Sequence, residues 1–402
     1  MLTNKVVFVF GIAKFDGAFE STSYTVAKFL ARDNKVFYID YPYTWKDYFR
    51  KRDDAFARRK SAFSFHNDGI LDTELENLKI LITPPLLPIN FLKEGPLYRW
   101  LLKVNERVIL RRIENLLQRL KIIDYLFINS FNFHYPNVGR KLNPSLYVYH
   151  CVDPLIVDYD VKHGLISEKK IVAECDLVIC TSKQLFLEKR KLNTSTYFIP
   201  NAADITHSGK ARAEELQVFP ELLKIKKPII GYFGNIERRL DYKLLEETIH
   251  SLPDYSFVFA GPIDKQWVPI NFKSLANVHF LGRVPYDKMP TVLKGFDVAM
   301  IPFKKDEVSQ TIFPLKLFEY LGTGKPVVAT DFNLDLKDFT GDTIKYSSTS
   351  TEFKEQIDAA LKGDSLDLQE HRIAIASENS WQRRLTELSD LLETYHAKRS
   401  TR

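Results

Sequence analysis

The sequence predicts an α/β protein built of two Rossmann-like halves that face a cleft. Three observations support this fold class. The chain has 402 residues, more than one hydrophobic core usually holds, so about two domains are expected. Short apolar runs typical of buried parallel strands alternate with segments of helical periodicity. The alternation stops near residue 203 in a polar, Lys-rich stretch and restarts at Pro228.

Residues 1–203 are predicted to form an N-terminal domain. Strands at 5–10 and 35–39 flank a helix at 20–31, which is the opening of a βαβ unit. Ligands collect at the carboxyl ends of strands in such sheets, so the loop from Gly11 to Gly17 is a candidate wall of the cleft. It lacks GxGxxG and therefore does not indicate a dinucleotide site. Further strands are predicted at 79–83, 125–129, 146–150, 176–180 and 196–199, whereas 41–78 reads as an irregular excursion around a short strand.

A long helix with a basic surface is predicted between Leu97 and Leu120. Its buried face is predicted to hold Leu97, Leu101, Val104, Val108, Ile113, Leu116 and Leu120. Its other faces carry Arg99, Lys103, Arg107, Arg111, Arg112 and Arg119. Residues 46–60 hold seven Lys or Arg against three Asp, so this segment is also basic, although the whole chain has a net charge of only +6. The pattern favours an anionic partner or membrane face over nucleic acid, with a merely solvated basic face as the alternative.

Residues 204–375 are predicted to form a second domain of the same kind. Strands are expected at 228–233, 256–260, 278–281 and 298–301, and helices at 241–250 and 289–294. The tail, residues 376–402, is predicted as a helix with apolar residues at 381, 385, 388 and 392. An amphipathic helix of this kind needs a surface to cover.

The stretch from Thr311 to Asp331 is predicted to form a loop, a short helix and a strand. Apolar residues from Leu315 to Leu321 recur at helical spacing, and two glycines then end the helix. Lys316 and Glu319 share a face near the helix N-terminus. That face can meet a phosphorylated ligand, because free N–H groups and a positive dipole end lie there. The alternative is an ordinary exposed pair of opposite charges.

Composition narrows the class of protein further. The N-terminal apolar stretch is short and β-branched, so it indicates a first strand rather than a signal peptide, and no run reaches the ~20 apolar residues of a membrane span. The three cysteines form neither a disulfide framework nor a CxxC metal pair, which indicates that the protein lies in a reducing cytoplasm. Nine scattered histidines do not suggest a metal cluster, and Glu319 stands where a P-loop needs glycine.

Several motifs in this order resemble nucleotide-sugar-dependent glycosyltransferases of the GT-B fold, specifically the retaining family 4 group. The resemblance is densest in the second half: GYFGNI at 231–236, NVHFLGRVP at 277–285, FDVAMIPF at 296–303 and PLKLFEYLGTGKPVV at 314–328. The first half matches more loosely through DLVICTS at 176–182 and IPN at 199–201. The resemblance implies two Rossmann-like domains, with a C-terminal helix that crosses back to the N-terminal one.

The resemblance also implies a donor site in the second half. Glu319 takes the place of the carboxylate that holds the ribose hydroxyls, and the first carboxylate of that motif falls at Thr311, which is not acidic. Fixed cations would neutralise a departing diphosphate without a metal ion or other cofactor, and Arg239 and Lys316 are the best matches for that role. The remaining residues implied in nucleotide-sugar binding are Gly11, Gly234, Asn235, Arg238, Arg283, Val284, Phe313, Pro314 and Leu315.

The acceptor side is predicted at the end of a strand in the first half. His150 and Asp153 are candidates for the group that accepts a proton from the acceptor hydroxyl, and Asp16 is a weaker one. If the donor phosphate takes that proton, as retaining members of the family are thought to do, His150 would position the sugar. The alternative is a hydrogen-bonded structural histidine.

The sequence therefore predicts a cytoplasmic glycosyltransferase, peripheral on the inner face of the membrane. It would move a sugar from a UDP- or GDP-sugar to a glycan or lipid-linked acceptor in surface polysaccharide assembly. An inverting mechanism with Asp153 as base stays open. Two other classes also stay open: a non-catalytic homologue that binds a sugar nucleotide as a scaffold, and a sugar-nucleotide epimerase. Thr311 is the feature that favours the scaffold.

Overall fold

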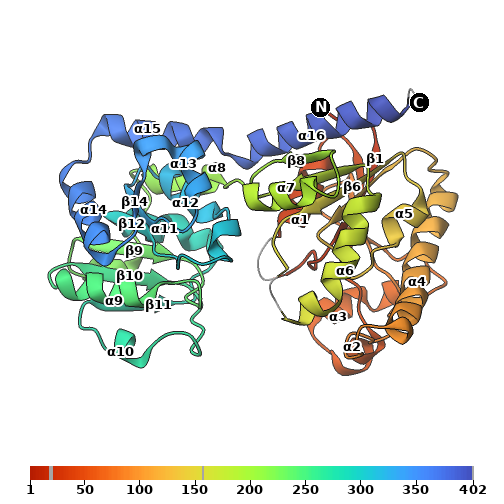
Figure 1. Ribbon diagram of the computed structural model, residues 1–402, viewed down its shortest axis with the longest axis horizontal. Helices are drawn as coiled ribbons and strands as arrows, with labels where there is room; N and C mark the ends of the chain where they lie inside the picture. Colours follow the sequence, from red (N-terminus) through yellow and green to blue (C-terminus); the bar gives the residue numbers. More distant parts are fainter. Residues whose placement is uncertain (18–20, 156–157, 401–402) are drawn as a thin grey trace. The chain divides into compact units, whose positions relative to one another are not determined.

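The computed structural model describes residues 1–17, 21–155 and 158–400 and divides the chain into two compact units (Figure 1). The N-terminal unit contains Met1–Pro200 together with Leu385–Arg402, and the C-terminal unit contains Asn201–Arg384. The sequence placed the divisions at 203 and 375. Each unit has its own hydrophobic core, as expected when one chain is too long for a single one.

The N-terminal unit is organised around an eight-stranded sheet in the order β3-β4-β2-β1-β5-β6-β7-β8. Its neighbouring strands pair in parallel except β3, which pairs antiparallel with β4 at one edge. The strands span Val6–Gly11 (β1), Lys35–Ile39 (β2), Ile70–Asp72 (β3), Leu78–Leu81 (β4), Leu126–Ser130 (β5), Leu146–Cys151 (β6), Leu177–Cys180 (β7) and Thr196–Phe198 (β8). The predicted strands are confirmed to within a few residues at their ends, because buried parallel strands carry nearly continuous apolar runs.

The excursion between β2 and β4 is more regular than the sequence indicated. It contains the two short helices α2 and α3 and a 3₁₀ turn before the edge strand β3. Thr44 and Asp53 cap α2 and α3 through their side chains. Tyr48 packs against Phe56 and Phe63, with ring centroids 5.6 and 5.8 Å apart, so the segment has a small aromatic core. Helices this short show too few turns for periodicity to reveal them.

The helices of the N-terminal unit cover the sheet (Figure 1). They span Thr22–Leu30 (α1), Trp45–Arg50 (α2), Asp54–Arg59 (α3), Pro96–Leu120 (α4), Val138–Leu142 (α5), Asp158–Glu174 (α6) and Lys183–Arg190 (α7).

The buried face of α4 differs from the predicted one. It begins with Tyr98 and Leu102 and continues through Ile109 to Leu116, whereas Leu97 is 60% exposed. The prediction was therefore wrong by about one position at the start of the helix. Arg112, expected on the basic surface, is buried: its guanidinium donates to the carbonyl oxygens of Ala62, Ser64 and Asn67. Burying a guanidinium is tolerable only when its donors are satisfied, and the excursion supplies those acceptors.

The C-terminal unit contains a six-stranded parallel sheet in the order β11-β10-β9-β12-β13-β14. Its strands span Ile229–Phe233 (β9), Ser256–Ala260 (β10), Val278–Gly282 (β11), Val298–Ile301 (β12), Val327–Thr330 (β13) and Lys345–Ser347 (β14). Its helices span Ile205–Ser208 (α8), Tyr242–Ser251 (α9), Ile270–Lys273 (α10), Met289–Gly295 (α11), Leu315–Gly322 (α12), Lys337–Thr340 (α13), Ser350–Lys362 (α14) and Leu366–Glu378 (α15). Strand β14 and helices α14 and α15 were not predicted individually.

The last helix, α16 (Trp381–Ser400), returns to the N-terminal unit (Figure 1). Leu388 and Leu392 are buried on its apolar face, and His396 Nε2 lies 3.1 Å from Asp124 Oδ1. At the start of the chain, the Leu2 backbone N–H donates to Ser389 Oγ at 2.9 Å. These contacts confirm the predicted crossing helix: its apolar stripe covers the N-terminal unit.

Candidate functional site

The switch point of the C-terminal sheet places three loops together. Strand β9 lies between β10 and β12, so the chain leaves β9 to one side and later returns to build the sheet on the other. Loops that follow such strands diverge and leave a hollow at their carboxyl ends, where ligands bind in open α/β sheets. The loops after β9, β10 and β12 therefore define the candidate donor site.

The turn after β9 is held closely against the turn after β10. The Gly234 N–H donates to Ala260 O at 2.8 Å, and both Gly234 and Gly261 have positive φ values, 150° and 147°. A Cβ atom on Gly261 would lie 2.0 Å from Gly234 O, and one on Gly234 would lie 2.7 Å from Lys316 Nζ. Only glycine fits at either position.

Helix α12 packs across the end of β9 through two polar contacts. Lys316 Nζ donates to the Tyr232 hydroxyl at 2.9 Å and lies 4.5 Å from the centroid of that ring. One turn further on, the Tyr320 hydroxyl accepts from Phe233 N–H at 2.8 Å. These bonds fix the lysine ammonium directly beside the Gly234 turn.

Glu319, on the same face of α12 as Lys316, contacts a different loop, the one after β11. Its Oε1 accepts a 2.7 Å hydrogen bond from the Tyr286 hydroxyl, and the residue is only 8% exposed. The Tyr286 ring stacks on His207 with a centroid distance of 4.8 Å. The Arg283-to-Tyr286 loop is thereby joined to α12.

Lys316 and Glu319 thus do not form the exposed pair that spacing alone allowed, because each has a different partner. Burial, and then the positive charge of Arg239, lower the pKa of Lys316 to about 7. Burial raises the pKa of Glu319, and the Tyr286 hydrogen bond and the charge on Lys316 partly offset that effect. A half-buried ammonium and a buried carboxyl on one helix face are therefore both partly removed from water, which is costly and typical of functional sites.

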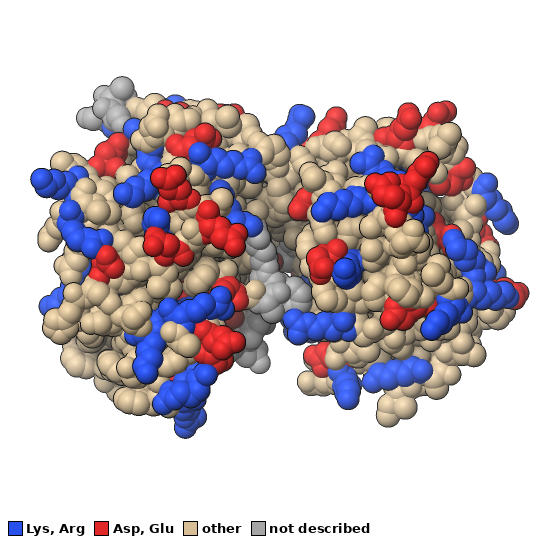
Figure 2. Space-filling model, turned by 180° about the vertical axis from the view of Figure 1, so that it is seen from behind, with Lys and Arg blue, Asp and Glu red and all other residues tan. Residues whose placement is uncertain are grey.

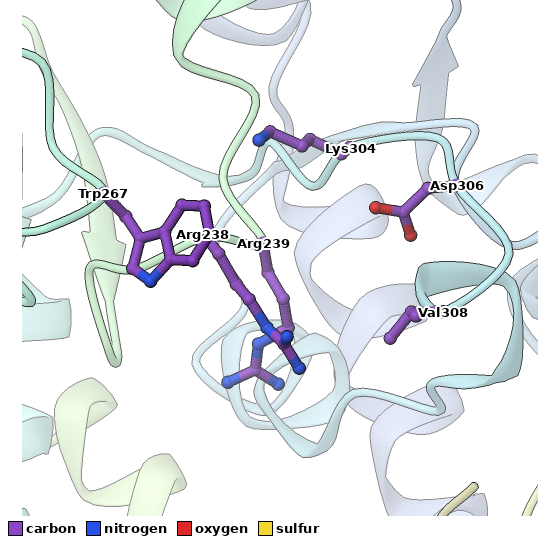
Figure 3. A pocket seen from close by; sticks show the side chains of 6 residues that line it. All are labelled: Arg238, Arg239, Trp267, Lys304, Asp306 and Val308. Atoms are coloured by element: carbon purple, nitrogen blue, oxygen red, sulfur yellow. The ribbon is translucent and has the colours of Figure 1, made fainter. Parts of the chain in front are cut away.

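Arg239 and Arg238 line a cavity of about 200 Å³ with Lys304, Trp267, Asp306 and Val308 (Figure 3). Arg239 forms an ion pair with Glu237, and its guanidinium lies 5.6 Å from the Phe303 ring centroid. Lys316 lies 5.0 Å from the same ring. The two predicted diphosphate-binding cations therefore flank one phenylalanine.

The other predicted donor-site residues lie around α12 and the loop after β11. Pro314 is the N-cap of α12, and among the described residues no side chain caps its first turn. Phe313 is buried and stacks on Phe318, whereas Leu315 is partly exposed. The Thr311 side chain lies outside the described part of the structure. Asn235 lies in the Gly234 turn, where its carbonyl accepts from the Tyr232 hydroxyl at 3.0 Å; Val284 is buried and Arg283 is exposed.

In the N-terminal unit, Gly11 and His150 lie in one row at the carboxyl edge of the sheet. Ser130 of β5 is the register partner of both, and its Oγ lies 3.1 Å from His150 Nδ1. Burial lowers the pKa of His150 to about 4, so its imidazole is neutral near pH 7. A Cβ on Gly11 would lie 2.1 Å from the Tyr38 hydroxyl, so packing against Tyr38 favours glycine here in addition to the predicted ligand contact.

The two acidic candidates differ in their surroundings. Asp153 is exposed just beyond β6. Asp16 forms ion pairs with Arg58 and Arg59 at 2.9 and 2.6 Å, so its carboxylate is already engaged within the unit.

Sequence reasoning missed three aromatic residues of the donor site: Tyr232, Tyr286 and Phe303. Tyr232 and Phe303 lie within quoted motifs and Tyr286 directly follows one, but a tyrosine or phenylalanine in or beside a strand usually indicates core packing. Only the tertiary structure shows that the two tyrosine hydroxyls bond Lys316 and Glu319. The hydroxyl of a buried tyrosine such as Tyr232 needs a partner, but its burial becomes known only from the structure, and Tyr286 is 46% exposed.

The basic surface of the N-terminal unit is narrower than predicted. Arg99 pairs with Glu94 and Arg119 with Asp68. The remaining exposed cations of α4 are Lys103, Arg107 and Arg111, and within the described ranges none of them has an ion-pair partner. Phe91 and Trp100, 76% and 61% exposed, precede them. Lys and Arg side chains also gather at the end of this unit where α2 and α3 lie (Figure 2).

Comparison with known proteins identifies the class. Residues 227–362, which contain the whole candidate donor site from Gly234 to Glu319, match the family model Glycosyl transferases group 1. Residues 227–362 are thus similar to the glycosyl transferases group 1, as the motifs in the second half of the sequence predicted.

The chain is also 28% identical over 216 residues to the putative teichuronic acid biosynthesis glycosyltransferase TuaH of Bacillus subtilis. The match covers 48% of this chain and 53% of the relative, so it spans about half the length of that protein.

Solved structures show the same fold over the whole chain. A sucrose-phosphate synthase from Thermosynechococcus elongatus superposes with a TM-score of 0.67 at 14% identity, covering 98% of this chain and 100% of that one. Anabaena HepE, solved in complex with UDP, superposes with a TM-score of 0.65 at 15% identity, covering 97% and 100%. No described helix of this chain is both long and apolar enough to cross a bilayer.

The close contact between the two turns leads to a test of stability. Gly261→Ala should destabilise the C-terminal unit by about 2 kcal/mol or more, because its Cβ would collide with the Gly234 carbonyl. Gly95→Ala is the matched control, since Gly95 has a similar φ of 157° but open space around it. Calorimetric melting should show a clearly lower transition for Gly261→Ala than for Gly95→Ala. Equal melting of the two variants would contradict the contact.

Proposed function

We propose that the protein is a glycosyltransferase that moves a sugar from a UDP- or GDP-sugar to a glycan or lipid-linked acceptor in surface polysaccharide biosynthesis. The observation that carries this proposal is the pair of charges on α12, half-buried Lys316 and buried Glu319, held by tyrosines at the sheet switch point. The family match over 227–362, the relative TuaH and the UDP complex of Anabaena HepE support it.

The donor would bind in three parts. Glu319 would accept hydrogen bonds from the ribose hydroxyls, beside the loop of Arg283 and Val284 that would contact the base. The diphosphate would approach the backbone of the Gly234 turn, where no side chain intervenes. Lys316 and Arg239, which both lie near the Phe303 ring, would face its charge.

The chemistry requires stabilisation of a leaving group. As the bond between the anomeric carbon and the phosphate oxygen breaks, negative charge grows on the diphosphate, and fixed cations lower the energy of that state. A bond forms between the acceptor oxygen and the anomeric carbon, and the acceptor proton passes to the released phosphate. We propose a retaining course from the resemblance to the family 4 group, and a metal-independent one because fixed cations can stabilise the leaving group.

His150 fits a positioning role better than that of a general base. A buried imidazole with a pKa lowered to about 4 is a weak base, whereas its neutral ring can hydrogen-bond a sugar hydroxyl. The Ser130 hydroxyl beside Nδ1 orients that ring.

Turnover separates this proposal from the two alternatives. Incubation with a panel of UDP- and GDP-sugars and a membrane extract should release nucleoside diphosphate and label the extract. Binding without release would indicate a scaffold, and a changed free donor sugar without an acceptor would indicate an epimerase.

Glu319 provides a test of nucleotide binding. Glu319→Ala should weaken binding of the preferred nucleotide, UDP or GDP, by roughly tenfold or more, because charge-assisted hydrogen bonds to the ribose are lost. Titration calorimetry measures the change, with Glu355→Ala, an exposed glutamate of α14, as the control. Unchanged affinity in Glu319→Ala would refute the ribose assignment.

Lys316 provides a test through pH. With its pKa near 7, the nucleotide-free lysine loses its proton above neutral pH, and a bound diphosphate must restore it. Nucleotide affinity should therefore fall as pH rises from about 7 to 9, with proton uptake on binding. The phosphates are fully ionised in this range, since their last pKa is about 6. Lys316→Met should bind more weakly and flatten the profile, whereas a flat wild-type profile would contradict the assignment.

We also propose that the N-terminal unit binds an anionic membrane surface. The exposed Trp100 would enter the interface, and Lys103, Arg107 and Arg111 would meet lipid headgroups. Such binding would hold the enzyme at the inner face of the cytoplasmic membrane, next to a lipid-linked acceptor.

Vesicle sedimentation tests the membrane proposal. Binding to vesicles with anionic lipid should be lost at high salt, absent with neutral lipid, and weakened severalfold by Trp100→Ser. Trp267→Ser, which removes an exposed tryptophan of the other unit, should bind like the wild type. If low-salt binding to anionic vesicles is undetectable, the proposal fails.

A further inference from the structure

The cavity beside Arg239 contains more positive charge than a diphosphate site alone requires. Its lining includes Arg238, Arg239 and Lys304 against a single carboxylate, Asp306 (Figure 3). That carboxylate already accepts a 2.7 Å hydrogen bond from the Ser309 N–H. Arg239 is paired with Glu237, whereas the side chains of Arg238 and Lys304 have no ion-pair partner in the described part of the chain.

The cavity is held in place by backbone contacts among three loops. The Lys304 N–H donates to Arg239 O at 2.8 Å, which ties the loop after β12 to the loop after β9. The Asp264 N–H donates to Ile236 O at 2.9 Å, which ties in the loop after β10 that carries Trp267. The unpaired cations therefore do not sit on one mobile segment: they come from two loops that are bonded together.

The cavity also adjoins the proposed diphosphate position. Arg239 lines it and shares the Phe303 ring with Lys316, so a donor whose phosphates lie at the Gly234 turn would extend toward it. Trp267, 44% exposed, provides an aromatic wall of the kind that packs against apolar faces of ligands. Unpaired cations with such a wall suit a sugar that carries a negative charge.

We propose that Arg238 and Lys304, with Trp267, form a second anion subsite that binds the carboxylate or phosphate group of an acidic sugar. The inference rests on the proposed function and narrows its substrate class. The charged group belongs either to the donor sugar or to a phosphorylated acceptor. Both would offer planar or tetrahedral oxygens to the guanidinium of Arg238 and the ammonium of Lys304, which point to different parts of the cavity in Figure 3 and would turn toward the bound group.

The first source, a donor sugar that carries the charged group, is tested with pairs of donors that differ only at one carbon. UDP-glucose and UDP-glucuronate differ by an alcohol against a carboxylate, and GDP-mannose and GDP-mannuronate serve if the protein prefers GDP. Calorimetry on the wild type should show roughly tenfold tighter binding of the acidic donor, the worth of one charge-assisted hydrogen bond. Arg238→Gln and Lys304→Gln should each abolish that preference. Lys304→Gln, which changes no residue of the predicted nucleotide site, should still bind plain nucleoside diphosphate.

Lys305→Gln is the matched control for charge. It removes the same positive charge from the next residue, but Lys305 pairs with Asp331 at 2.6 Å and does not line the cavity. This variant should keep the preference for the acidic donor. If Lys305→Gln reduces the preference as much as Lys304→Gln does, a diffuse field and not a subsite is responsible, and the proposal is overturned.

The second source, a phosphorylated acceptor, is tested with glucose 6-phosphate. Added to the nucleotide-saturated protein, it should bind the wild type and Lys305→Gln but not Arg238→Gln or Lys304→Gln if the charge belongs to the acceptor. Equal affinities for both donors together with no dependence of sugar-phosphate binding on Arg238 or Lys304 would overturn the subsite. If neither UDP nor GDP binds at all, the proposed function itself fails, and that result is distinct from a nucleotide that binds without discrimination.

Discussion

The packing of helix α12 across the end of β9 is the contact on which the rest of the C-terminal site depends. Lys316 and Tyr320 of the helix bond Tyr232 and Phe233 at the end of the strand, so helix and turn move as one. A Cβ on Gly234 would lie 2.7 Å from Lys316 Nζ, so the glycine leaves room for the ammonium beside the turn. A backbone turn without a side chain, a lysine above it and an acid one helical turn away are therefore consequences of a single packing arrangement.

That arrangement is expensive for stability, which is why it points to function. Lys316 is half-buried and Glu319 is buried, and their separate tyrosine partners only partly replace the hydration that each has lost. A core built for stability alone would place apolar residues there. Held in this way, the two groups need little rearrangement when a charged ligand arrives, since their rotamers are already fixed by bonds to the scaffold.

The N-terminal unit uses a similar device to fix its first loop. Arg59 of α3 is fully buried and bonds Asp40 at the end of β2 and Asp16 in the loop after β1, at 2.7 and 2.6 Å. Asp40 also accepts from the Phe15 N–H at 3.0 Å. The aromatic excursion between β2 and β4 thus orders a loop that is distant from it in sequence. Buried charges of this kind hold only while every partner is present.

The sequence alone determined the two α/β halves, most strands, and the crossing helix, because buried strands and amphipathic helices leave periodic patterns that local rules can detect. It also placed Lys316 and Glu319 on one helix face. It could not determine that Tyr232 and Tyr286 would bond them, that Arg112 would be buried, or that Lys304 would join Arg238 in one cavity. Those outcomes depend on which loops meet at the switch point of the sheet, and contacts between distant segments leave no local pattern.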